Sequence, residues 1–346
     1  MRYLVTGHKG YIGSDLTRKL LKLGHEVIGI DNGYFEDCKF DNYPLNPPFK
    51  SIKKDLRDIV EEDLKGIDTV FHLAALSNDP IGNLNSKWTD DINNSASLQL
   101  AKFSKSIGVP KFIFSSSCIM YGESDLDVVD ETSPVDPKTD YAKSKVAAEK
   151  EILKLADSKF APVSLRNGTV YGLSEFMRFD TVTNDFVGSA MCTGKIIIKG
   201  NGKPWRPVVY VGDISRSFIE VSKAPSNVIS GEIFNNGTNE LNIQIFKLAE
   251  VVANIIKGTK VEVLEKNDED QRTYKASFNK LKNYFPDFKF EFDPYNGVKK
   301  LYEEFQNIGL NKDDYLSGKF IRLKNLTRLV EDGLLDNNLS WINKSL

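Results

Sequence analysis

The sequence has few cysteines and no long apolar segment. Its 346 residues contain three cysteines, Cys38, Cys118 and Cys192, which are far apart. So few thiols argue against a disulfide framework and a zinc site, and no bound metal is expected. No apolar run approaches the roughly 20 residues of a membrane span, and the first residues lack the charged-then-apolar layout of a signal peptide. We therefore expect a protein of the reducing cytoplasm that has no membrane contact.

The sequence also lacks an excess of either charge. It has 46 lysines and arginines against 48 aspartates and glutamates, a formal net charge of -2, and no long basic block. This balance gives no electrostatic reason to expect a nucleic-acid partner or an anionic membrane surface. With 40% hydrophobic residues, the chain is long enough to bury a large core.

Short apolar stretches alternate with helix-length amphipathic stretches in the first half of the chain. The strand-like stretches cover residues 3–6, 26–31, 69–73 and 111–114, and the helical ones cover about 12–23, 93–107 and 141–155. This alternation predicts an α/β protein with a doubly wound parallel sheet, the Rossmann arrangement, and ligands at the carboxyl ends of the strands. After residue 166 the rhythm weakens, which indicates a smaller C-terminal α/β lobe.

A glycine loop joins the first strand to the first helix. Gly7, Gly10 and Gly13 have the spacing that lets a backbone approach a pyrophosphate at a helix N-terminus, with Tyr11 and Ile12 between the last two. Alone, such a loop is also compatible with an ordinary strand-helix turn.

Asp31 ends the second strand-like stretch, and Asp55 follows a further short apolar stretch before residue 69. Asp31 is placed to bind both ribose hydroxyls and to repel a 2'-phosphate, and Asn32 follows it with no arginine nearby. Together with the glycine loop, Asp31 favours NAD over NADP as the cofactor. Asp55 and Leu56 are expected to bracket the adenine, although Asp55 is equally suited to cap a helix.

A tyrosine and a lysine four residues apart suggest acid-base chemistry. Tyr141 and Lys145 fall on one face of a helix, so the ammonium can lie beside the phenol. A free phenol has a pKa of about 10, and a neighbouring positive charge lowers it towards the pH at which general-base catalysis is efficient. Each residue alone also fits an aromatic core contact or a solvated helix face.

Taken together, these motifs resemble the extended short-chain dehydrogenase/reductases of the nucleotide-sugar epimerase/dehydratase family, from Met1 to about residue 300. The matching stretches are 7–13, 72–75, Asn93, 115–117 with 121–122, Tyr141 with Lys145, 166–172, 205–207 and 211–213. The resemblance implies that Leu73, Ala74, Ala75, Asn93 and Ser115 contact the dinucleotide. His72 is interpreted as a core histidine.

The resemblance also implies a catalytic set. Ser117, Tyr141 and Lys145 would act on a sugar hydroxyl as hydride leaves the same carbon for the nicotinamide. Family members that eliminate water have acidic residues just after the serine or threonine, whereas this chain has Cys118 and Ile119 there. Dehydration is therefore disfavoured. A 4-epimerase and a net 4-dehydrogenase of carbohydrate biosynthesis both remain open.

For the substrate, the resemblance points to a nucleotide-diphosphate sugar. Two guanidinium groups, Arg206 and Arg272, are the candidates for binding its diphosphate, with surface ion pairs as the alternative. Asn167 and Asn184 are candidates for sugar contacts, and the segment 177–180 is expected to shape the sugar pocket. The competing functions are a dehydrogenase of a non-nucleotide alcohol and a non-catalytic NAD-binding sensor or scaffold.

These considerations divide the chain into three parts. Residues 1–165 are predicted to form the NAD-binding Rossmann domain, to which later segments return, and residues 166–310 the substrate-binding lobe. Residues 311–346 are predicted to form a solvated helical appendage without a chemical role. The resemblance further implies a homodimer in which the helices near 93–107 and 141–155 pair across a twofold axis.

Overall fold

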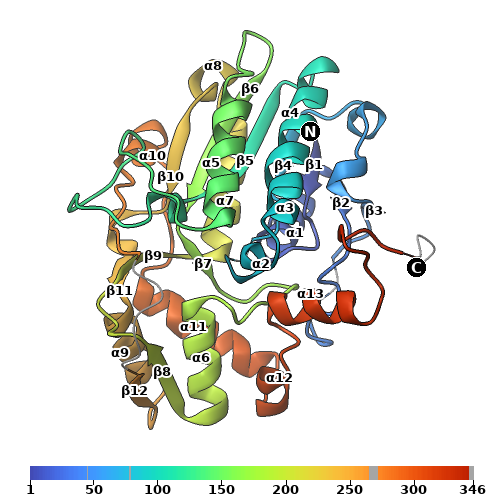
Figure 1. Ribbon diagram of the computed structural model, residues 1–346. Coiled ribbons are helices and arrows are strands. Elements are labelled where there is room, and N and C mark those ends of the chain that lie inside the picture. The colour runs from blue at the N-terminus through green and yellow to red at the C-terminus, as the bar shows by residue number, and fades with distance from the viewer. Residues whose placement is uncertain (45, 78, 265–271, 343–346) are drawn as a thin grey trace.

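The computed structural model describes residues 1–44, 46–77, 79–264 and 272–342, and its centre is a seven-stranded parallel sheet (Figure 1). In spatial order its strands are β10 (Ile233–Asn236), β6 (Ala161–Asn167), β5 (Lys111–Ser117), β4 (Thr69–His72), β1 (Arg2–Thr6), β2 (Glu26–Asp31) and β3 (Lys50–Lys53). The order reverses direction between β1 and β4, which creates the crevice where doubly wound sheets bind ligands. The predicted Rossmann sheet is thereby confirmed.

Helices cover both faces of the sheet. One face carries α1 (Tyr11–Lys22) and α7 (Val211–Lys223), and the other carries α4 (Ala96–Ser106) and α5 (Asp140–Leu153). Alternate residues of one strand serve the two faces: Tyr3 and Val5 join the core beneath α1 and α7, while Leu4 joins the core beneath α4 and α5. Strands covered on both faces are continuously buried, as β4 and β6 are.

Shorter helical segments connect these elements. They are α2 (Asp79–Leu84), α3 (Ser86–Thr89), a π-helical turn (Asp90–Ser95), α8 (Ser226–Ile229), α10 (Asn279–Tyr284) and the short 3-10 turns Leu56–Asp58, Glu61–Leu64, Cys118–Tyr121 and Asn239–Leu241. In the described part of the chain, none of the helices combines the length and the apolar character needed to cross a bilayer.

A smaller lobe lies below the carboxyl ends of the large sheet (Figure 1). It contains β7 (Thr169–Tyr171), β9 (Trp205–Tyr210) and β11 (Asn242–Gln244) in one sheet and β8 (Lys195–Lys199) with β12 (Lys260–Leu264) in another. Its helices are α6 (Val182–Thr193), α9 (Ile245–Ile255), α11 (Pro294–Asn307) and α12 (Lys312–Leu316). The lobe is interrupted by α7, α8 and β10, which return to the large sheet.

The C-terminal segment differs from the predicted solvated appendage. Its described residues contain α12, α13 (Arg322–Glu331) and the turn that follows α13. Leu326, Leu329, Leu335 and Leu339 are buried in the core that also contains Leu4. Leucines three residues apart lie on one face of a helix, so α13 is amphipathic and packs against the large domain. The predicted helical character is present, but the expectation of a solvated segment was wrong because its many charged residues masked that stripe.

Candidate active site

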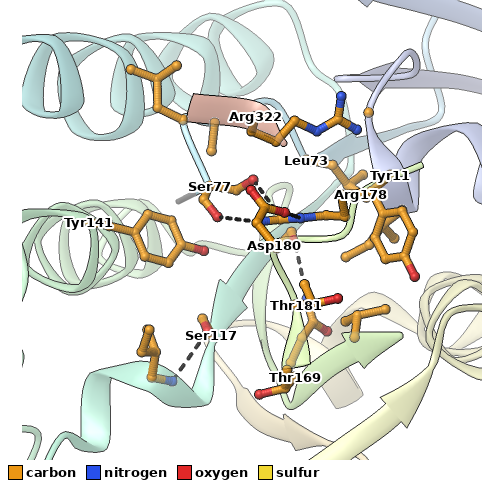
Figure 2. A pocket seen from close by; sticks show the side chains of 18 of the residues that line it. Tyr11, Leu73, Ser77, Ser117, Tyr141, Thr169, Arg178, Asp180, Thr181 and Arg322 are labelled. Carbon is orange, nitrogen blue, oxygen red and sulfur yellow. Dashed lines mark hydrogen bonds and ion pairs between the residues drawn. The ribbon is translucent and has the colours of Figure 1, made fainter. Parts of the chain in front are cut away.

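A cavity of about 1230 Å³ opens at the carboxyl ends of the sheet, between the large domain and the small lobe (Figure 2). Its wall includes most of the residues singled out from the sequence. They are Gly7, Gly10, Tyr11, Ile12, Gly13, Asp31, Asn32, Leu56, Leu73, Ala74, Ala75, Ser115, Ser117, Tyr141, Lys145, Asn167, Arg206 and Arg272. The cavity thus combines the predicted cofactor, catalytic and substrate groups.

The glycine loop at one end of the cavity has no room for side chains. A Cβ on Gly7 would lie 2.7 Å from the backbone nitrogen of Ala74, and one on Gly13 would lie 2.0 Å from the carbonyl oxygen of Gly7. Gly7 also has a φ of +75°, which favours glycine. Gly10 caps α1 without a side-chain hydrogen bond, so the first amides of the helix face the cavity as an anion site.

Asp31 stands beside this loop at the end of β2. Its two carboxylate oxygens accept backbone N–H groups from Lys9 at 3.1 Å and Gly33 at 2.8 Å, which fix the side chain at the cavity wall. A fixed carboxylate next to a glycine-rich helix start suits the ribose and pyrophosphate of a dinucleotide. The amides at the start of α1 and the Asp31 carboxylate therefore fit NAD.

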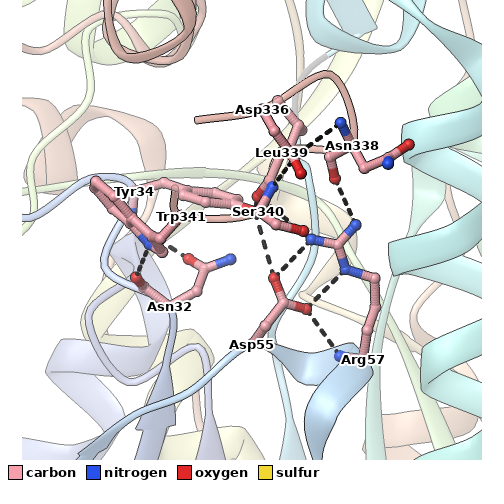
Figure 3. Close-up of polar contacts among 9 residues, drawn as sticks. All are labelled: Asn32, Tyr34, Asp55, Arg57, Asp336, Asn338, Leu339, Ser340 and Trp341. Carbon is pink, nitrogen blue, oxygen red and sulfur yellow. Dashed lines mark hydrogen bonds and ion pairs between the residues drawn. The ribbon is translucent and has the colours of Figure 1, made fainter. Parts of the chain in front are cut away.

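Asp55, another candidate for cofactor binding, is engaged by its own chain. Asp55 accepts hydrogen bonds from the Arg57 backbone and guanidinium at 2.8 to 2.9 Å and does not line the cavity, although Leu56 does (Figure 3). Burial acts to raise the pKa of Asp55, but the hydrogen bonds from Arg57 outweigh it and lower the pKa. Asp55 caps the 3-10 turn Leu56–Asp58, which is the alternative role expected for it. Its contact with adenine stays a prediction.

Asn93 is fully buried beneath the loop that follows β4. Its amide accepts the N–H of Leu76 at 2.8 Å and donates to the carbonyl of Leu76 and to the Ser144 hydroxyl, and it does not line the cavity. It therefore holds the loop after Ala75 in place. His72 is a core histidine, as interpreted, because both of its ring nitrogens bond buried hydroxyls at 2.7 Å.

The three catalytic candidates open into the same cavity. Ser117 ends β5, and Tyr141 and Lys145 lie one turn apart near the start of α5. The Tyr141 hydroxyl points into the cavity from one side and Ser117 lies on the adjoining wall (Figure 2). The Lys145 side chain is only 2% exposed, its Nζ lies 4.6 Å from the centre of the Phe114 ring, and burial lowers its pKa to about 7.

The two residues after Ser117 supply no carboxyl group. Cys118 is fully buried, and its Sγ donates to the carbonyl oxygen of Arg166 at 3.1 Å. Burial raises the pKa of this thiol, so it is held in the protonated form. Ile119 lines the cavity as an apolar side chain.

The predicted substrate residues are spread over different parts of the site. Arg206 and Arg272 meet at the far wall, where the Arg206 guanidinium donates to the carbonyl oxygens of Trp205 and Arg272 and lies 5.7 Å from the centre of the Tyr274 ring. Asn167 lines the cavity and donates to the Ser115 hydroxyl at 3.0 Å.

Asn184 is fully buried and outside the cavity wall. It accepts the N–H of Gly172 at 2.9 Å and donates to the Tyr11 hydroxyl and the carbonyl of Arg178, both at 2.9 Å. It therefore braces the loop that carries Arg178, and its contact with sugar stays a prediction.

Several further charged side chains line the wall, among them Glu123, Lys138, Arg178, Asp180 and Arg322. Arg178, in the loop expected to shape the pocket, pairs with Asp180 at 2.6 Å and donates to the Ser77 hydroxyl at 3.2 Å (Figure 2). Arg322 of α13 also lines the cavity, and sequence reasoning missed it. It is a single arginine in a charged tail, and no local motif distinguishes it from Arg328 on the same helix.

Comparison with known proteins agrees with this geometry. The profile of the NAD dependent epimerase/dehydratase family matches residues 3–237. The chain belongs to this family. It is an NAD-dependent enzyme of the nucleotide-sugar epimerase/dehydratase superfamily, and the resemblance inferred from its motifs is confirmed.

Individual relatives span several reactions of the epimerase/dehydratase family. A UDP-glucose 4-epimerase of Mycolicibacterium smegmatis is 30% identical over 69% of this chain and 77% of its own. A human dTDP-D-glucose 4,6-dehydratase is 29% identical over 75% of each chain. The solved structure of a UDP-N-acetylglucosamine 4-epimerase from Methanobrevibacter ruminantium is similar with a TM-score of 0.77 and 26% identity, covering 88% of this chain and 98% of that one.

Proposed function

We propose that this enzyme oxidises the C4 hydroxyl of a nucleotide-diphosphate sugar and returns hydride to the opposite face, which makes it a 4-epimerase that eliminates no water. One observation carries the proposal. Ser117, Tyr141 and Lys145 open into the cavity that holds the glycine loop, while Cys118 and Ile119 supply no acid for a leaving hydroxyl. Elimination needs such a group beside the reacting carbon.

NAD, when bound, supplies the hydride acceptor and donor. The Tyr141 phenolate would take the proton of the C4 hydroxyl, and in the reverse step would return it to the C4 oxygen. The Ser117 hydroxyl would donate a hydrogen bond to that oxygen and stabilise its developing charge. In its charged form, Lys145 would favour the phenolate, since a neighbouring positive charge lowers the pKa of a phenol.

The walls of the cavity support a nucleotide-diphosphate substrate. Arg206 and Arg272 stand together, and guanidinium groups bind diphosphates through paired donors. A non-nucleotide alcohol has no use for such a pair. A non-catalytic sensor has no use for a buried lysine beside a tyrosine.

The two 4-epimerase relatives also support this outcome over net dehydrogenation. An epimerase keeps its dinucleotide through turnover, because the same cofactor must return the hydride that it received. Net dehydrogenation has no supporting observation in the cavity, and it becomes an outcome of the experiment below. The homodimer through α4 and α5 stays a prediction for sedimentation analysis.

The proposal is tested by incubating the purified protein with UDP-, dTDP-, GDP- and CDP-sugars and analysing the products by mass and NMR. We expect a product of unchanged mass with an inverted C4 centre. Loss of two hydrogens with accumulation of reduced cofactor would identify a dehydrogenase, and loss of water would overturn the interpretation of Cys118 and Ile119.

A further inference from the structure

Arg322 is a buried cation that forms no ion pair with any residue described in the structure. The residue is 3% exposed, and its guanidinium lies 4.5 Å from the centre of the Phe35 ring. Nη2 donates to the carbonyl oxygen of Phe176 at 2.7 Å, while Nη1 is buried and has no hydrogen-bond partner. Figure 2 shows the side chain reaching from the start of α13 to the cavity wall.

The surroundings of Arg322 leave room for an anion to bind it. Throughout the described ranges, no carboxylate forms an ion pair with it, and Asp180, which also lines the cavity, is already bound by Arg178 at 2.6 Å. Burial and the nearby positive charge of Arg178 lower the pKa of the Arg322 guanidinium, whereas the Cys38 thiol and the Asp180 carboxylate favour the charged form without reversing this shift. An uncompensated buried charge is costly, so a buried cation at a cavity wall favours an anionic ligand there.

We propose that Arg322 binds the diphosphate of the dinucleotide, so that the C-terminal helix completes the cofactor site. A guanidinium offers two parallel donors to phosphate oxygens. The assignment to the cofactor rests on position. The Arg322 guanidinium stacks on the ring of Phe35, which lies four residues after Asp31 in the turn after β2. Arg206 and Arg272, in contrast, lie in the small lobe. The inference rests on NAD binding and is independent of the reaction proposed above.

The turn after α13 is attached to the same end of the cavity (Figure 3). The Trp341 Nε1 donates to the carbonyl of Asn32 at 2.8 Å, the Tyr34 hydroxyl donates to the carbonyl of Leu339, and Arg57 donates to that of Asn338 at 2.6 Å. Asn32 and Tyr34 line the cavity next to Asp31. The segment 322–342 therefore fastens Arg322 over the loops that surround the adenosine half of the site.

The test compares two substitutions on one helix in the full-length protein. Arg322→Met removes the buried cation, and Arg328→Met is the matched control, because Arg328 is half exposed, pairs with Asp37 and does not line the cavity. After bound nucleotide is removed, NAD, adenosine and UDP are titrated into each variant by calorimetry. We expect Arg322→Met to weaken NAD about 10- to 100-fold, to leave adenosine and UDP unchanged, and to be partly rescued by Arg322→Lys.

Thermal unfolding separates binding from folding. Because the Arg322 cation is uncompensated without ligand, we expect the NAD-free Arg322→Met protein to melt within a few degrees of the Arg328→Met protein, but to gain a much smaller increase in melting temperature from NAD. Equal NAD affinity in the two variants would overturn the proposal. So would a selective loss of UDP affinity, because the guanidinium would then bind the diphosphate of the sugar nucleotide.

Discussion

The Nζ of Lys145 lies 2.9 Å from the carbonyl oxygen of Ser115 and donates a hydrogen bond to it. This contact fixes α5 against the end of β5, and the lysine is buried on the helix face that also carries Tyr141. The serine run and the Tyr-Lys pair thus form one unit. Ser117, two residues further along β5, opens into the same cavity.

Replacing Tyr141 with phenylalanine should remove the acid-base group and leave the cavity intact. We expect turnover to fall by about 10²- to 10⁴-fold, because this is the usual contribution of a positioned proton-transfer group. NAD affinity should stay within a factor of a few. Steady-state kinetics and calorimetry measure the two quantities, with Tyr295→Phe, an exposed position, as the control. Full activity in Tyr141→Phe would eliminate the residue from the mechanism.

Lys145 should give the free protein a characteristic pH dependence of stability. Burial lowers its pKa to about 7, below its unfolded value near 10.4. Between these two values the unfolded chain binds more protons, so the free energy of unfolding increases as pH rises. The free energy of unfolding of wild type minus that of Lys145→Met should therefore increase between pH 7 and 10, by at most about 1.4 kcal/mol per pH unit. A pH-independent difference from urea denaturation would contradict this.

The buried ion pair behind the catalytic helix should contribute strongly to stability. Glu149 on α5 accepts the Arg166 guanidinium at 2.6 Å and the Ser164 hydroxyl at 2.6 Å, with both charged side chains almost inaccessible. Glu149→Gln leaves Arg166 uncompensated and should cost about 3 kcal/mol in the free energy of unfolding. Glu151→Gln, on the same helix but in an exposed pair with Lys154, should cost less than about 1 kcal/mol. Equal losses in urea denaturation would refute the assigned role of Glu149.

The parts of the fold and site that depend on local sequence were predictable. The glycine loop, Asp31 and the Tyr141–Lys145 pair each combine fixed spacing with a strand or helix pattern, and all of them line the cavity. Arg322 was not predictable, because it reaches Phe35 from 287 residues further along the chain and its contact exists only in the tertiary structure.

The ligand candidates Asn93, Asp55 and Asn184 illustrate the opposite limit of sequence reasoning. A buried amide or carboxylate needs hydrogen bonds. In these three residues the backbone or side chains of the protein itself supply them. Sequence patterns mark such residues as polar and suitably spaced, but they do not tell whether the partner is a ligand or the chain.

The central claim is that hydride leaves C4 and returns to C4 without loss of water, and a substrate deuterated at C4 tests it most directly. Using a nucleotide sugar that the protein converts, mass spectrometry and NMR would locate the label in the product. The account predicts unchanged mass, with deuterium retained at an inverted C4. Deuterium at C6 in a product lighter by one water, or deuterium lost to released cofactor, would contradict it.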